Sequence, residues 1–168
     1  MTGERSPSDV PDIRRFEKFI YDEVKLLDQR HFEDWMALFD DDAYYWAPST
    51  PDQTDPYNHV SLFFDDKATM ATRITRLRHP RIHVQTPPSR TVHMVSNVVI
   101  EDQEAGSVEY LVGCNFLMLE YRPGHEQRTY GGSYQYRLRA NDDAFRIAWK
   151  RANLVNCDAT FPALALPF

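Results

Sequence analysis

The chain has few cysteines, no long hydrophobic run and no excess of positive charge. Its two cysteines, Cys114 and Cys157, have no partner at metal-ligand spacing, so we predict that both are reduced and buried. No stretch approaches the roughly 18 apolar residues that a membrane span needs. The start lacks the basic and apolar regions of a secretory signal. These absences predict a cytoplasmic protein that does not bind membranes.

Acidic residues outnumber basic ones by 25 to 19, which gives a net charge of −6. A chain of this charge has no general attraction to phosphates, so we predict that it does not bind nucleic acid. Its 168 residues, of which 42% are hydrophobic, are enough to bury a core. We therefore predict a single domain over residues 1–168, with disorder confined to residues 1–8.

The first half of the chain has helical periodicity. Apolar residues recur at steps of three and four over residues 13–27, which predicts a helix with one buried stripe. Two further helices are predicted over residues 32–39 and 65–78. The three aspartates at 40–42 are expected to form a solvated turn after the second helix.

The second half has the periodicity of strands. Short turns separate four predicted strands, over residues 91–101, 107–121, 128–139 and 144–155. An earlier strand is predicted over residues 43–47, before a proline-rich loop over 48–59. Strands joined by short turns must be antiparallel neighbours. Helices followed by such a meander predict an α+β fold.

Two of these strands differ in how their faces are built. Strand 128–139 alternates between apolar and polar residues, whereas strand 107–121 is apolar on both sides. Three helices can cover only one face of a sheet, so a partner subunit is expected to cover the other. Alternatively, the sheet curls around an internal cavity. Gly131 and Gly132, in mid-strand, predict a bend that would give the sheet a conical shape.

The sequence contains little that suggests catalysis. It has no glycine-rich phosphate loop, no Gly-x-Ser-x-Gly elbow and no Cys-x-x-Cys pair. His79 and His83 are four residues apart, but Pro80 interrupts any helix between them and a third ligand is not evident. We therefore predict no metal site and no bound cofactor in this chain.

His93 is the one acid–base candidate. It alternates with Asn97 and Val99 on one predicted strand face, and Tyr44 and Trp46 are expected to face the same interior. With a carboxylate such as Asp40 or Asp42, His93 would form a dehydratase-like or isomerase-like site. A hydrogen-bonded interior or interface histidine is the simpler interpretation.

Residues 87–98, Pro-Pro-Ser-Arg-Thr-Val-His-Met-Val-Ser-Asn-Val, resemble a signature of aromatic-ring-hydroxylating dioxygenase β subunits. That signature reads Pro-Ser-Arg-Thr-Arg-His-x-x-Ser-Asn-Val, and Val92 stands where an arginine is common. Residues 23–28 and 32–39 resemble the family's first two helices, residues 44–48 its aromatic strand and residues 150–158 its closing strand. The resemblance therefore extends over nearly the whole chain.

The resemblance implies a cystatin-like cone, the nuclear-transport-factor-2-like fold, with N-terminal helices packed in a strongly curved, mostly antiparallel sheet. It implies a trimer of this chain within an α3β3 hexamer. The partner α subunit would carry a Rieske 2Fe–2S cluster and a mononuclear Fe(II), and would add dioxygen to an aromatic substrate with electrons from a reductase. The β subunit would support assembly without independent activity, and the α subunit would set substrate and regiospecificity.

Subunit contacts are commonly anchored by aromatic and arginine side chains. On this basis the contact candidates are Arg76, Arg78, Arg90, Tyr134 and Trp149. Ion pairs within the chain, or packing between strands, would explain the same residues equally well. Loop 48–59 is expected to approach the α subunit. Two other functions stay open, an autonomous dehydratase or isomerase that uses His93, and a cone domain that binds a small ligand.

Overall fold

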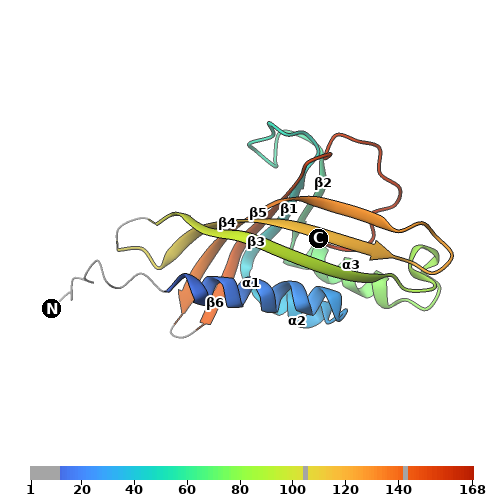
Figure 1. Cartoon of the computed structure of the whole chain (residues 1–168), viewed down its shortest axis with the longest axis horizontal. Helices are drawn as coiled ribbons and strands as arrows, with labels where there is room; N and C mark the ends of the chain where they lie inside the picture. Colours follow the sequence, from blue (N-terminus) through green and yellow to red (C-terminus); the bar gives the residue numbers. More distant parts are fainter. Residues whose placement is uncertain (1–11, 104–105, 142–143) are drawn as a thin grey trace.

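The structure is a computed structural model that describes residues 12–103, 106–141 and 144–168 (Figure 1). Its helices are α1 (Ile13–Asp28), α2 (Phe32–Ala37), α3 (Lys67–Arg78) and the short 3-10 helix η2 (His83–Gln85). Its strands are β1 (Phe39–Pro48), β2 (Ser61–Asp66), β3 (Arg90–Asp102), β4 (Glu109–Tyr121), β5 (Arg128–Asn141) and β6 (Ala144–Leu154). The predicted α+β class is confirmed.

The strands form one curved sheet in the order β2-β1-β6-β5-β4-β3. Consecutive strands from β3 to β6 pair antiparallel, as their short connections predict, and so do β1 and β2. The pairing of β1 with β6 is parallel, and the chain from β2 to β5 supplies the long connection that a parallel pair needs. Helices α1 and α2 lie along the same side of this sheet (Figure 1). The core lies between the helices and the sheet, inside the predicted cone.

Local sequence explains where the helices begin and end. The Asp12 side chain accepts a hydrogen bond from the Arg14 N–H at 3.1 Å and caps α1. Asp66 caps α3 in the same way, through the Thr69 N–H at 2.8 Å. Helix α3 stops at Arg78, because Pro80 disfavours helical geometry in the residue before it.

Two expectations for the first half of the chain were wrong. Asp40, Asp41 and Asp42 do not form a turn, because β1 begins at Phe39 directly after α2 and contains all three. Strand β2 was not predicted, since its residues 61–66 are too few to show a clear alternation. It pairs with β1 through contacts such as Trp46 with Phe64.

Irregularities in two strands change which side chains face the core. In β3, Asn97 has a φ of 56° and the register with β4 shifts, so Val99 is 50% exposed instead of sharing the inner face with His93. In β6 the register shifts between Ile147 and Trp149, so that Lys150 points inward after Ile147. The predicted common face of His93, Asn97 and Val99 is therefore wrong.

The paired glycines of β5 permit close packing against both neighbouring strands. A Cβ on Gly132 would lie 1.8 Å from the Asn153 main-chain oxygen. A Cβ on Gly131 would lie 2.6 Å from Leu117 Cδ2. A larger residue at position 132 would push β5 away from β6, whereas one at position 131 would displace the Leu117 side chain.

Candidate functional site

A buried ion pair lies inside the cone, between α1 and the sheet. Glu23 and Lys150 are both fully buried, and Lys150 Nζ donates to Glu23 Oε1 at 2.7 Å. The same carboxylate accepts from Trp35 Nε1 at 2.5 Å and from the Tyr136 hydroxyl at 3.1 Å. Burial lowers the pKa of Lys150, and the nearby carboxylate of Glu23 opposes that shift. The pair is thus compensated in charge and well supplied with hydrogen bonds.

Sequence reasoning missed both members of this pair. Glu23 lies on the apolar face of α1, between the buried Ile20 and Val24, and an acidic residue in that position is a signal of a buried partner. Lys150 gave no such signal, because regular alternation from the start of β6 places it on the outer face. Only the register shift before Lys150 turns it inward.

His93 pairs with Asp28, at the end of α1. His93 Nδ1 lies 2.6 Å from Asp28 Oδ1, and the His93 N–H donates to Oδ2 at 2.9 Å. The Thr91 hydroxyl also donates to Oδ1, at 2.8 Å. Burial alone would raise the pKa of Asp28, but the hydrogen bonds and charge of His93, with the Thr91 bond, outweigh burial and lower it. This cluster ties the end of α1 to β3.

The structure does not form the acid–base site expected between His93 and Asp40 or Asp42. Those aspartates bind arginines at the sheet surface, and the His93 side chain is only 1% exposed. Tyr44 and Trp46 do not face the same interior either. Tyr44 stacks on Trp149 on the outer face, and Arg151 covers the Trp46 ring there. Alternation along β1 points Tyr45, not its neighbours, into the core.

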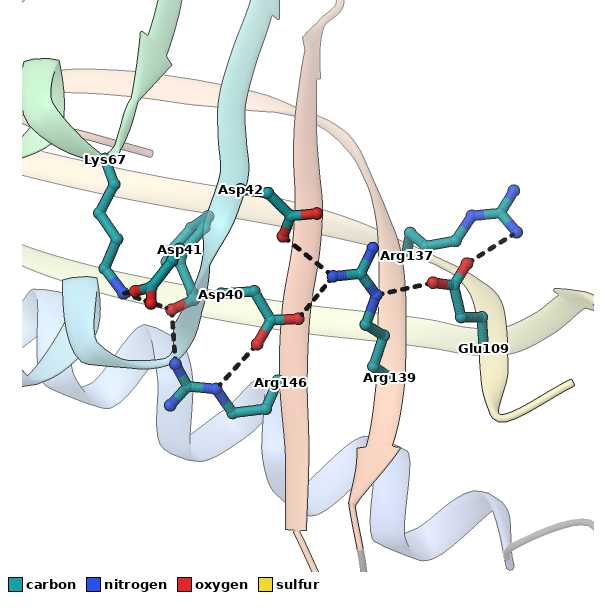
Figure 2. Close-up of polar contacts among 9 residues, drawn as sticks. Asp40, Asp41, Asp42, Lys67, Glu109, Arg137, Arg139 and Arg146 are labelled. Atoms are coloured by element: carbon teal, nitrogen blue, oxygen red, sulfur yellow. Dashed lines mark hydrogen bonds and ion pairs between the residues drawn. The ribbon is translucent and has the colours of Figure 1, made fainter.

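A network of ion pairs connects four strands at one end of the sheet (Figure 2). Arg139 of β5 binds Asp40 at 2.9 Å, Asp42 at 3.0 Å and Glu109 at 2.7 Å. Arg146 of β6 binds Asp40 at 3.2 Å and also donates to the Phe39 main-chain oxygen. The network therefore holds the start of β1 against β5 and β6 through Asp40 and Asp42, which explains why these two aspartates are not part of a solvated turn.

The outer face of the sheet carries exposed apolar side chains among polar ones. Four side chains of β3 and β4 on this face are about half exposed, namely Val92, Met94, Val99 and Leu117. Beside them lies a groove of about 920 Å³, whose lining includes Met94, Leu117, Arg151 and Pro51. This arrangement agrees with the two apolar faces expected for strand 107–121. An apolar face of this kind typically marks a contact surface.

The contact candidates lie in different surroundings. Tyr134 is fully buried, so its expected role as a surface contact is wrong, because the sheet directs it into the core. Arg78 makes a two-point ion pair with Glu33 of its own chain. Arg76 is exposed, and Arg90 is exposed beside the Tyr121 ring, 5.3 Å away. Trp149 is partly exposed on the outer face, next to Arg137.

Cys114 and Cys157 are both free and buried, and burial raises the pKa of the Cys114 thiol to about 12. In the described ranges, no three His, Cys, Asp or Glu side chains gather so as to hold a metal ion. No helix within those ranges is both long and apolar enough to cross a bilayer.

Comparison with known proteins identifies close relatives. The family model described as "Ring hydroxylating beta subunit" matches residues 22–160. The small oxygenase component of the p-cumate 2,3-dioxygenase system of Pseudomonas putida is 35% identical over 162 residues, covering 90% of this chain and 88% of that protein. The 2-halobenzoate 1,2-dioxygenase small subunit of Burkholderia cepacia is 32% identical, covering 82% and 85%.

The fold agrees with a solved structure of the same kind. The benzoate 1,2-dioxygenase β subunit of Burkholderia mallei ATCC 23344 superposes with a TM-score of 0.72 at 26% identity. The match covers 88% of this chain and 93% of that subunit. The Pro-Ser-Arg-Thr segment and the other segments that suggested this family lie within the matched residues 22–160.

Proposed function

This chain belongs to the ring-hydroxylating dioxygenase β subunits, and from that premise we propose that it is the non-catalytic assembly subunit of its complex. It is a subunit of a multicomponent aromatic dioxygenase and works with an α oxygenase subunit. In the proposal, residues 1–168 act as one cytoplasmic domain without independent activity. Three copies associate and hold three α subunits in an α3β3 hexamer.

The open outer face of the sheet is the observation that carries this proposal. Met94, Val99 and Leu117 are about half exposed, on a face that none of the described helices covers (Figure 1). A second copy of the chain can cover such a face, since apolar burial stabilises association by roughly 25 cal/mol per Å² before the cost of association is subtracted. Trp149 and Arg151 lie at the other side of the same face and supply the aromatic and arginine anchors typical of contacts.

The iron centres belong to the α subunit in this proposal. The side chains of this chain support placing the iron in the α subunit. Among the described residues no three metal-ligating side chains lie together, and both free cysteines are buried. A Rieske cluster needs two cysteines and two histidines, and the mononuclear Fe(II) needs an open site. The β subunit contributes a rigid support that fixes where the α subunits lie relative to one another.

The exposed arginines are proposed contacts to the α subunit. Arg76 and Arg90 fit this role better than Arg78, whose guanidinium is already engaged by Glu33. Their charge would be used in hydrogen bonds to α-subunit carboxylates. Loop 49–60 projects from the sheet on the side away from α1, and we propose that it also approaches the α subunit (Figure 1).

The test is light scattering on the chain alone, followed by co-expression with its α subunit. We expect a trimer alone, a hexamer in the mixture, iron only in the α subunit, and aromatic dihydroxylation only by the mixture. Met94→Lys places a charge on the open face and should give monomers, whereas Tyr21→Lys, at 45% exposure on α1, should remain trimeric. A wild-type chain that stays monomeric alone and ignores the α subunit would refute the proposal.

A further inference from the structure

Residues 161–168 run back toward the cone, and Phe168 is buried inside it. In this segment only Leu166 and Phe168 are buried, at 6% and 1% exposure. The segment has no regular secondary structure and lies beyond the residues that match the family model. Its place in the core is therefore set by the side chains that receive Phe168.

Four strands contribute one contact each to Phe168. Its ring centre lies 5.1 Å from that of Tyr130 and 5.7 Å from that of Phe63. Its N–H donates to the Tyr45 hydroxyl at 3.0 Å. Its main-chain oxygen accepts from Lys150 Nζ at 3.0 Å. The residue is thus held as a small ligand is held, by aromatic walls and by polar groups that fix its orientation.

The surroundings of Phe168 are more polar than stability requires. Lys150 is shared between Glu23 and the Phe168 oxygen, and its Nζ lies 4.1 Å from the centre of the Tyr134 ring. The Tyr134 hydroxyl is buried and makes no hydrogen bond within the part of the chain that the structure describes. Apolar residues of similar size would stabilise a core at least as well as a buried ion pair. Polar groups that converge on an aromatic-lined interior are typical of a binding site.

The segment does not fill the interior completely. A void of about 20 Å³ remains between the segment and the cone, lined by Ala165 and Pro167 on one side and by Trp35, Tyr45 and Phe63 among others on the opposite side. A space of that volume is sufficient for one water molecule. The void lies against Ala165 and Pro167, next to the buried Leu166 and Phe168.

We propose that the interior of the cone is a binding site for a small aromatic molecule with a carbonyl or carboxylate oxygen near its ring, and that Phe168 occupies it as the chain's own ligand. The ring of such a molecule lies between Tyr130 and Phe63. Its oxygen accepts from Lys150. The site requires neither the α subunit nor iron, so it stands or falls independently of the assembly function.

The ring site is tested with Phe168→Ala in the full-length chain, using benzene as the probe. We expect a lower thermal midpoint, and a rise of about 3 to 6 °C when benzene is present at ten times its Kd. Phe161→Ala is the matched control, because it removes the same side chain from a half-buried position in the same segment. Wild type and this control should not respond to benzene.

Three results would overturn the ring site. They are no benzene response in Phe168→Ala, an equal response in Phe161→Ala, and an equal response in wild type. If Phe168→Ala is unfolded when purified, it is refolded from denaturant with and without benzene. Recovery only with benzene supports the proposal, and failure in both conditions counts against it.

The oxygen site is tested in a chain that lacks residues 161–168, with 3-phenylpropanamide and 3-phenylpropanoate as probes. Both molecules reproduce the ring of Phe168 and a carbonyl carbon separated from that ring by two carbons, as Cβ and Cα separate them in phenylalanine. We expect at least one to bind, and the double substitution Glu23→Gln/Lys150→Met in the same background, which leaves no unpaired buried charge, to weaken that binding at least tenfold. Preference for the amide or for the acid identifies a carbonyl or a carboxylate as the natural acceptor. Binding that the double substitution leaves unchanged, or no binding to a folded truncated chain, refutes the oxygen site.

Discussion

Lys150→Met should strongly destabilise the chain, because it leaves the Glu23 carboxylate buried without its cation. Both side chains are fully buried, and Lys150 supplies hydrogen bonds to Glu23 and to the Phe168 oxygen. Removing one partner of a buried ion pair typically costs about 3 to 5 kcal/mol. For a chain of this length, each kcal/mol lowers the thermal midpoint by about 2 to 4 °C. We therefore expect the midpoint to fall by about 6 to 20 °C.

The reverse substitution should cost less. Glu23→Gln keeps an oxygen that accepts from Trp35 and removes only the charge, while Lys150 can become neutral because burial already lowers its pKa. The double variant Glu23→Gln/Lys150→Met contains no buried charge, so its free energy of unfolding should exceed that of Lys150→Met. The three variants form a double-mutant cycle, measured by urea unfolding, that isolates the interaction between the two side chains.

Lys18→Met provides the matched control for this cycle. It removes a lysine from an ion pair with Asp22, but there the two side chains are 75% and 60% exposed. Exposed pairs of this kind contribute little to stability, so no clear change is expected. If Lys150→Met were as stable as Lys18→Met, the expectation that the buried Glu23 carboxylate needs its cation would be refuted.

Three further results are expected. Asp28→Asn should lower the free energy of unfolding by about 1 to 3 kcal/mol at pH 7. Because the pKa of Asp28 is lowered in the fold, its contribution is present above the ordinary value of 3.8 and is lost as pH falls through the lower folded value. In urea unfolding, the difference in stability between wild type and variant should therefore shrink in acid, and a difference independent of pH would contradict this. Arg139→Met should lower the free energy of unfolding by about 1 to 2 kcal/mol in low salt and by less in 1 M NaCl. The reason is that the ion pairs of Arg139 with Asp40, Asp42 and Glu109 are partly exposed, so salt screens them. A loss of stability that salt does not change would contradict this. Carbon NMR should find the Glu33 pKa at about 2, held down by the hydrogen bond from Arg78, and Arg78→Met should return it toward 4.5; an unchanged pKa would show that the ion pair does not form in solution.

Much of the fold follows from local patterns. The stripe over residues 13–27, the four later strands and their short turns were all predictable, because each depends on residues close in sequence. The family could be suggested from sequence for a related reason, since residues 87–98 keep their order and spacing. The apolar second face of β4 was also predictable, because alternation along one strand assigns side chains to two faces.

The candidate site was less predictable, because it joins residues far apart in sequence. Asp28 and His93 are 65 positions apart, and the wrong carboxylates were expected to face His93. Glu23 and Lys150 are 127 positions apart. The inward direction of Lys150 depends on a shift in register that cannot be predicted from the residues of β6. A one-residue irregularity reverses every later side chain in a strand, so sequence alternation fails beyond it.

The sequence by itself determined the fold class, most of the strands and helices, the apolar outer face of the sheet and the family. Each of these is encoded in neighbouring residues or in the order of short segments. Tertiary structure alone decided that Asp40 and Asp42 bind arginines, that Tyr134 is interior, and that Phe168 lies against Lys150. The physical reason is that these contacts depend on strand register and on the path of the chain after β6, which are fixed only when the whole sheet has assembled.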